Sequence, residues 1–285
     1  MKWKIGDVTI TKVLEKEMHW PFKALLPAAT EEVVDGVPWL APHYVDEAGK
    51  LILSVHCLAI ESQGQRLLVD TCIGNDKDRP TRPFDGLDTS FLSDLEAAGF
   101  PRDSVDAVMC THLHVDHVGW NTMLVDGVWV PTFSNARHLF DRTEYDHWVE
   151  AGPKELDIFG DVMGDSVAPI VDAGLADFVN GDGHKVTDEV WLESTPGHTP
   201  GHYSVRISSG GEDAVITGDM THHPIQYAHP DLGSPADTDS ATAIATRQSF
   251  IERYGDTPTL VIGTHFAGPT AGRIVSDGAA WRLDT

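Results

Sequence analysis

The chain has 285 residues, of which 41% are hydrophobic and 22% are charged, a balance typical of a folded globular protein rather than a disordered one. Its formal net charge is −24. A surface this acidic repels phosphate backbones and anionic lipid headgroups, which argues against nucleic acid or a membrane as a partner.

The N-terminal part of the sequence predicts paired strands separated by a long irregular segment. Residues 3–13 and 54–69 each contain alternating or continuous apolar residues around a glycine-containing turn, a pattern typical of β-hairpins. Residues 18–50 contain several aromatic side chains but little periodicity. We expect this segment to be an insertion that covers the functional site or forms a dimer interface.

Strands and helices then interleave along the rest of the chain. Helices are predicted at 89–98, 142–150 and 240–254, and strands at 105–110, 138–140, 190–193, 203–207, 214–218 and 260–262. Since no linker or low-complexity segment divides these elements, we expect a single domain over residues 1–285. Its predicted class is α/β, with two mixed sheets packed face to face and helices outside.

The segment 111–117 contains three histidines and an aspartate directly after a short apolar run. Imidazole and carboxylate ligands together suit zinc, iron or manganese ions. His112 and His114 are two positions apart, so both rings can face one ion. Asp116 and His117 belong to the next turn and would face a different point. The spacing therefore predicts two metal sites, and the alternative is a solvent-exposed loop rich in histidine.

Three further candidate ligands, His198, Asp219 and His265, each follow an apolar run and have small residues beside them. One such residue alone is more often structural than a ligand. Together they complete a count of three ligands for each ion: His112, His114 and His198 for one, Asp116, His117 and His265 for the other, and Asp219 between them. Such a set leaves an open position for solvent at both ions, as catalysis requires.

This ordered set of motifs, H-x-H-x-D-H, P-G-H-T-P-G-H, T-G-D and G-T-H, resembles that of the metallo-β-lactamase superfamily over residues of about 54–265. The resemblance implies an αββα sandwich with a dinuclear centre at one edge of the sheets. It also implies two divalent ions, with zinc favoured and iron, manganese or cobalt as alternatives. By the same likeness Asp70 would orient a ligand histidine, although an aspartate that only ends a strand is the simpler alternative.

The finer resemblance concerns the type of hydrolase. Asp116 favours enzymes of the lactonase, glyoxalase or phosphodiesterase kind over true β-lactamases. The chain length and the aromatic insertion look most like the N-acyl homoserine lactonases and the methyl parathion hydrolase group. Those lactonases carry a tyrosine three positions after the bridging aspartate, whereas this sequence has His222 there. Tyrosine-assisted chemistry is therefore not expected.

We predict a dinuclear hydrolase in which a metal-bridging hydroxide opens a lactone or cleaves an ester of a small hydrophobic compound. Asp116, Asp219 and His222 are the expected catalytic residues, with His222 as the proton donor to the leaving group. The alternative for His222 is a role in holding its loop. The alternative functions are phosphotriester hydrolysis with the same site and a non-catalytic, metal-binding sensor.

Aromatic residues are the expected walls of the substrate pocket. They are Trp20, Phe22 and Trp39 in the insertion and Trp120, Trp129 and Phe133 after the metal motif. The sequence lacks an apolar signal region and a membrane-spanning run, and its three cysteines have no disulfide-like spacing. We therefore expect a cytoplasmic protein with a small-molecule substrate, and a homodimer if residues 18–50 form an interface.

Overall fold

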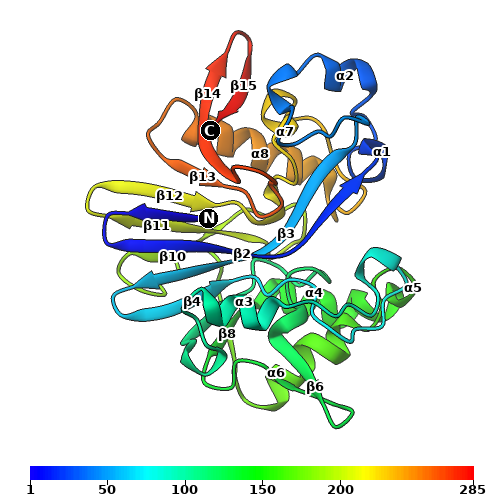
Figure 1. Ribbon diagram of the computed structural model, residues 1–285, viewed down its shortest axis with the longest axis vertical. Coiled ribbons are helices and arrows are strands. Elements are labelled where there is room, and N and C mark those ends of the chain that lie inside the picture. The colour runs from blue at the N-terminus through cyan, green and yellow to red at the C-terminus, as the bar shows by residue number, and fades with distance from the viewer.

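Two β-sheets pack face to face in the computed structural model, which describes residues 1–285 except for the side chain of Pro153 (Figure 1). The first sheet has the strand order β1 (Lys2–Ile5), β2 (Val8–Trp20), β3 (Leu51–Ser62), β4 (Gln65–Val69), β5 (Ala107–Met109), β8 (Arg137–Asp141) and β9 (Ala176–Val179). The second has the order β10 (Val190–Ser194), β11 (Tyr203–Ser209), β12 (Glu212–Ile216), β13 (Leu260–Ile262), β14 (Ala271–Asp277) and β15 (Ala280–Asp284).

Helices cover the outer face of each sheet (Figure 1). Those on the first sheet are α3 (Phe91–Ala97), α4 (Arg142–Ala151) and α6 (Ala168–Asp172). Those on the second are α1 (Phe22–Leu25), α2 (Glu31–Asp35), α7 (Ile225–Ala228) and α8 (Ser240–Tyr254). The helix α5 (Leu156–Phe159) follows α4 and lies at one end of the first sheet (Figure 1). The result is the predicted αββα sandwich.

The buried side chains form one layer between the sheets and one beneath each helical face. The middle layer joins alternate residues of both sheets, among them Ile10 and Leu58 from the first and Val205 and Ile216 from the second. β3 is buried along almost its whole length because its two faces contribute to different layers, which explains its continuous apolar sequence.

Strand direction determines where the candidate ligands lie. β4, β5 and β8 run parallel to one another in the first sheet, and β12 and β13 run parallel in the second. The segments that follow β4, β5, β12 and β13 reach the same edge of the sandwich, as the convergence of their side chains shows. Loops at the carboxyl ends of strands are the usual place for a site in α/β folds.

The structure changes the predicted extent of the insertion at residues 18–50. β2 continues to Trp20, so the first three residues of the predicted insertion belong to a strand. The remainder forms α1, α2 and a 3₁₀ turn at Pro38–Leu40, which pack against the second sheet. Burial of these apolar side chains explains why the segment is ordered without a periodic sequence pattern.

Sequence patterns did not predict the short hairpin of β6 (Thr122–Val125) and β7 (Val128–Pro131), nor the terminal pair β14 and β15. The Asp126-Gly127 dipeptide at the first of these turns is a hairpin signal that could have indicated it.

None of the helices in the described part of the chain is both long enough and apolar enough to cross a membrane.

Candidate metal centre

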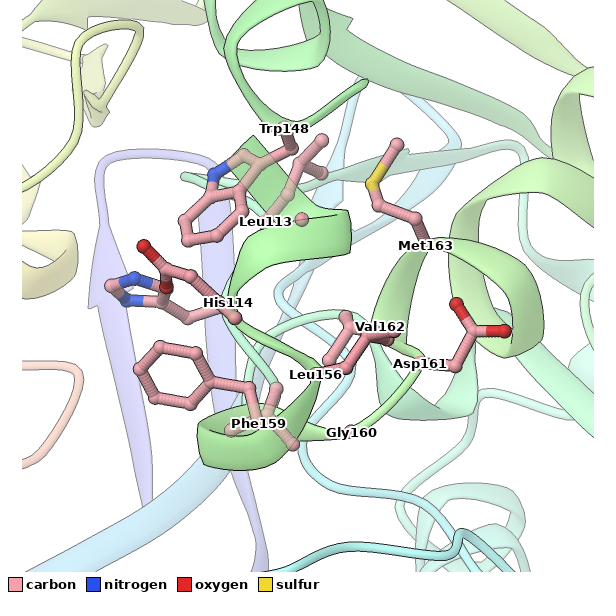
Figure 2. Close-up of a pocket in the computed structure, with 12 residues that line it drawn as sticks. Leu113, His114, Trp148, Leu156, Phe159, Gly160, Asp161, Val162 and Met163 are labelled. Atoms are coloured by element: carbon pink, nitrogen blue, oxygen red, sulfur yellow. The ribbon is translucent and has the colours of Figure 1, made fainter. Parts of the chain in front are cut away.

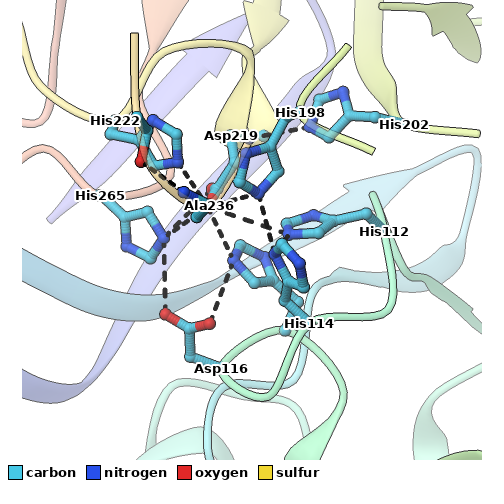
Figure 3. Close-up of polar contacts among 12 residues, drawn as sticks. His112, His114, Asp116, His198, His202, Asp219, His222, Ala236 and His265 are labelled. Carbon is cyan, nitrogen blue, oxygen red and sulfur yellow. Dashed lines mark hydrogen bonds and ion pairs between the residues drawn. The ribbon is translucent and has the colours of Figure 1, made fainter. Parts of the chain in front are cut away.

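The seven predicted ligands lie together at one edge of the two sheets (Figure 3). The loop after β5 supplies His112, His114, Asp116 and His117, and the segments after β10, β12 and β13 supply His198, Asp219 and His265, respectively. Residues from four separate segments thus converge on one buried point, and apart from the partly exposed Asp116 all of them are buried.

One group, the three-histidine half-site, consists of His112, His114 and His198. His112 Nε2 lies 3.0 Å from His114 Nδ1, and His198 Nε2 lies 2.9 Å from the same His114 atom. Three ring nitrogens this close together, all buried, point toward a common centre. His114 differs from its two partners because it presents Nδ1 rather than Nε2.

The second group, the aspartate half-site, consists of Asp116, His117 and His265. His117 Nε2 lies 3.7 Å from Asp116 Oδ1, and His265 Nε2 lies 3.6 Å from Asp116 Oδ2. The Asp116 carboxylate therefore faces both rings. Asp116 and His117 are the pair that the sequence spacing predicts, and His265 is the third ligand that the ligand count assigns to them.

Asp219 lies between the two half-sites. Its Oδ2 is 3.6 Å from His198 Nε2 and 3.4 Å from His117 Nε2, and its Oδ1 is 3.1 Å from His265 Nε2. Hence it contacts rings from both groups, as a bridging ligand must. His222 Nε2 is also 3.4 Å from Asp219 Oδ2, which brings His222 to the same centre.

The unpaired atoms of the cluster fit bound cations. Among the described residues, His117 Nε2 and Asp219 Oδ1 are buried and lie near other groups of the cluster, but none of these contacts has the geometry of a hydrogen bond. Buried polar atoms are normally paired, and these two lie within a cluster of further donors, so a bound cation would satisfy both of them. The donor set of imidazoles and carboxylates is that of zinc and related transition metals.

Electrostatics support the same interpretation. Burial acts to lower the pKa of His117, but Asp219, Asp70 and Asp116 outweigh it and raise that pKa well above its usual value. The pKa of His265 is raised in the same way, since Asp219 outweighs the effect of burial. The carboxylates therefore create a negative potential that favours positive charge at this point. At the three-histidine half-site, burial and the neighbouring rings lower the pKa of His112 and His114, so both are neutral, as metal ligands must be.

Two of the candidate ligand histidines are oriented by carboxylates at their other ring nitrogen. Asp70 Oδ2 lies 2.9 Å from His117 Nδ1, the position expected from the resemblance, and Asp70 also accepts a hydrogen bond from the Thr111 backbone N–H. Asp237 Oδ1 lies 3.0 Å from His198 Nδ1. No motif in the sequence marked Asp237, because it is 39 residues from its partner.

The second histidine of the P-G-H-T-P-G-H motif supports the backbone of Asp219. His202 Nε2 accepts a hydrogen bond of 2.8 Å from the Asp219 backbone N–H. Gly218 has a φ of +56°, and a Cβ at this position would lie 2.4 Å from His202 Nε2. The small residue before Asp219 is therefore required both by backbone conformation and by this close approach.

A cavity of about 300 Å³, here called the main cavity, opens over the cluster. Asp116, His198, Asp219, His222 and His265 form its polar floor. Its walls are mainly apolar, and they include Met18, Trp20, Leu25, Leu53, Phe84 and Phe159.

A second hollow of about 150 Å³, here called the inner pocket, is drawn in Figure 2. His114, Val115 and Phe159 line both spaces. Trp148, Leu156 and Met163 form much of the remaining inner wall, and Figure 2 shows them around the space beside His114.

The predicted aromatic walls need correction, because of the set only Trp20 lines the main cavity in the described chain. Phe22, Trp120 and Phe133 are buried in core layers, and Trp39 packs against one of them. Trp120 donates a hydrogen bond to Glu15, and Trp129 lies beneath the Lys77 ammonium group. For these side chains, burying a large aromatic surface in the core is energetically more favourable than leaving part of it exposed at a pocket.

Comparison with known proteins agrees with this architecture. The family model of the metallo-beta-lactamase superfamily matches residues 52–265. The N-acyl homoserine lactonase AiiA of Bacillus thuringiensis subsp. kurstaki is 26% identical over 181 residues, which cover 59% of this chain and 64% of that protein. The match thus spans less than two thirds of that relative's length.

Two solved structures share the fold over nearly their full lengths. AidC, described as a dizinc quorum-quenching lactonase in complex with a product, is 22% identical with a TM-score of 0.79, over 99% of this chain and 96% of that one. The hydrolase AbOPH is 23% identical with a TM-score of 0.80, over 100% and 96% of the two chains. The family match covers most of the chain, and the chain belongs to the metallo-beta-lactamase superfamily.

Proposed function

We propose that this protein is a metal-dependent hydrolase that opens a lactone or cleaves an ester of a small hydrophobic compound. The observation that carries the proposal is the position of the seven-residue His/Asp cluster at the floor of an otherwise apolar cavity. The relationship to AiiA, a protein described as an N-acyl homoserine lactonase, supports the same class of substrate.

Two divalent ions, with zinc as the best fit to the donors, would be held by the two half-sites with Asp219 between them. When bound, such ions supply Lewis acidity, which lowers the pKa of water and polarises a carbonyl group.

The protein's own groups would orient the reactants and handle the proton. Asp116 faces the cavity and would accept a hydrogen bond at a carboxylate oxygen from the attacking water. As that water's oxygen forms a bond to the acyl carbon, the bond to the leaving oxygen breaks. The proton that the water gives up would pass by way of the Asp116 carboxylate to the leaving oxygen, so that the products are an acid and an alcohol group. The apolar walls would exclude other water from this exchange.

His222 is the proposed partner of the leaving oxygen because it lines the cavity beside Asp219. Burial lowers the pKa of His222 to about 3, so its ring is neutral at pH 7 and carries one N–H. We therefore propose that it donates a hydrogen bond to the leaving oxygen from the neutral form.

The shape of the cavity favours an ester over a phosphotriester. The inner pocket shares His114, Val115 and Phe159 with the main cavity, and we propose that it receives a single apolar substituent of the substrate. A phosphotriester must place three substituents around phosphorus.

The test is turnover of a panel of lactones, aryl esters and phosphotriesters by zinc-loaded protein, with chelator-treated protein as the control. We expect turnover of lactones or esters that chelation abolishes. Preference for phosphotriesters would replace the proposed substrate, and absence of turnover across the panel would contradict the proposed hydrolase.

Variants at two adjacent histidines test the role of His222. His222→Ala should lower kcat by about 100-fold, the usual scale for losing a hydrogen-bond donor to the charge that develops in the transition state. His223→Ala is the matched control, because His223 is equally buried but its Nε2 bonds to the Tyr44 carbonyl, 2.9 Å away. It should lower stability without lowering kcat, and an unchanged kcat in His222→Ala would end the proposed role.

A further inference from the structure

Asp237 connects a candidate metal ligand to the wall of the main cavity. It lies in the loop between α7 and α8, and its side chain is fully buried. Asp237 Oδ1 is 3.0 Å from His198 Nδ1, whereas Oδ2 accepts a hydrogen bond of 2.9 Å from the Ser234 backbone N–H. The two oxygens of one carboxylate thus serve two different segments.

Ser234, Pro235 and Ala236 line the main cavity directly before Asp237, and Figure 3 shows Ala236 beside the histidine cluster. The backbone continues the same attachment beyond Asp237. Thr238 N–H donates to the His198 carbonyl at 2.8 Å, and Asp239 N–H donates to the Gly197 carbonyl at 3.0 Å. The wall loop is therefore fixed to the ligand loop by both side chain and backbone.

The hydrogen bond also determines which nitrogen of His198 is free. A carboxylate acceptor at Nδ1 keeps the proton on that atom, so that Nε2 carries the lone pair. His198 Nε2 is the atom that faces His114 and Asp219. Asp70 has the same relation to His117 in the other half of the centre.

We propose that Asp237 is a positioning residue that holds His198 in its metal-binding orientation and, through the same carboxylate, holds the Ser234–Ala236 wall of the cavity. The inference rests on the proposed function in that His198 is taken as a ligand of one ion. Its consequence is that ion affinity at the three-histidine half-site and the fit of the substrate are linked through one side chain.

Two substitutions at Asp237 separate the linked roles. Asp237→Ala removes both acceptors. Asp237→Asn retains one acceptor oxygen and replaces the other by an NH₂ group, so it can accept from His198 or from Ser234 but not from both. Asp239→Asn is the matched control because Asp239 lies two residues away, is exposed, and caps α8 through the Ala241 and Thr242 backbone N–H groups.

Zinc affinity of chelator-stripped protein is measured by competition with a chromophoric chelator, and the absorption spectrum of the Co²⁺-substituted protein reports the ligand geometry. In Asp237→Ala we expect affinity for one of the two ions to fall by about 10- to 100-fold, the usual effect of removing a partner behind a ligand histidine, with an altered Co²⁺ spectrum. Asp239→Asn should match the wild type in both measurements.

Asp237→Asn keeps the test decisive if the alanine variant fails to fold. If its oxygen accepts from Ser234, we expect weakened zinc binding. If its oxygen accepts from His198, we expect a raised KM with unchanged kcat on a substrate found in the panel. Zinc affinity, Co²⁺ spectrum and KM all within twofold of Asp239→Asn would overturn the proposal, as would a wild-type protein that binds no zinc. Wild-type protein that binds two zinc ions but hydrolyses nothing would contradict the proposed hydrolase alone, since the affinity test does not need turnover.

Discussion

At the scale of single residues, Glu144 is the buried group that joins the two ligand loops of the three-histidine half-site. Its Oε1 accepts hydrogen bonds from the Leu113 backbone N–H at 3.0 Å and from Trp148 Nε1 at 2.7 Å. Its Oε2 accepts one from the Gly201 backbone N–H at 3.0 Å. One carboxylate therefore satisfies three donors from three segments.

Replacing Glu144 by leucine should destabilise the protein strongly, because each buried donor left without an acceptor costs about 1–3 kcal/mol. We expect a loss of about 3 kcal/mol or more in the free energy of unfolding, measured by urea denaturation. Glu150→Leu on the same helix is the control, since Glu150 is exposed and pairs only with Lys154. Equal effects of the two substitutions would show that the Glu144 network contributes little.

The buried side chain of His138 leads to a prediction about how stability depends on pH. Burial lowers its pKa from 6.5 to about 3, and both ring nitrogens are buried. Since the pKa is lower in the folded protein than in the unfolded chain, the unfolded chain binds more protons between these values. The part of the folding free energy that depends on His138 is thus most favourable above pH 6.5 and becomes less favourable as the pH falls toward 3.

His138→Phe removes this titration, so the melting temperature of the variant should fall less steeply than that of the wild type between pH 7 and pH 4. Calorimetry of both proteins across this range provides the comparison. The same change at the exposed His43 should leave the steepness as it is in the wild type. Parallel curves for wild type and His138→Phe would refute the assignment.

At the scale of elements, the site depends on how closely two loops approach each other. Gly119 follows the histidine motif, and a Cβ at this position would lie 1.7 Å from the Ile73 carbonyl oxygen. Gly119 N–H also donates to the Cys72 carbonyl at 2.8 Å. The other side of this junction is held by Glu15 at the bulge of β2, which accepts hydrogen bonds from the Ile73 and Gly74 backbone N–H groups.

Gly119→Ala should push these loops apart and cost about 1–3 kcal/mol of stability, as overpacking usually does. It should also weaken zinc binding, because the loop that carries Asp70 moves relative to His117. Thermal unfolding and zinc titration measure the two effects. Gly36→Ala is the control, since a Cβ there meets its nearest atoms at 3.4 Å. If both glycine variants lose the same stability and the same zinc affinity, the close approach of the two loops does not explain the glycine at position 119.

At the scale of the whole molecule, metal binding should contribute to the stability of the sandwich. The candidate ligands come from segments of both sheets. The carboxylates of Asp116 and Asp219 both lie near His265, and among the described residues their ionic partners are histidines alone. A ligand that binds only the folded state stabilises it by about 4 kcal/mol when its concentration is 1,000 times its Kd.

Chelation should therefore lower the melting temperature, and buffered free zinc should restore it in a concentration-dependent way. Calorimetry over a series of free zinc concentrations measures the effect. Calcium at the same concentrations is the control, because a site rich in imidazole does not suit it. A melting temperature independent of zinc would contradict the metal centre.

The sequence by itself determined the parts of this protein that depend on local pattern. Hairpins and amphipathic helices follow from periodicity and turn residues within short windows, and the ligands stand out because each follows a strand end. Asp116 and His117 could be assigned together from their spacing alone. These features are readable because the residues that define them are neighbours in the chain.

Only the tertiary structure decided which distant side chains meet. Asp237 and Glu144 act on loops that are 39 and 57 residues away in sequence, and nothing local distinguishes them from surface carboxylates. For the same reason Trp120 and Phe133 were expected at the pocket but lie in the core. Whether an aromatic or acidic side chain is buried, paired or exposed depends on long-range packing, which a local pattern does not contain.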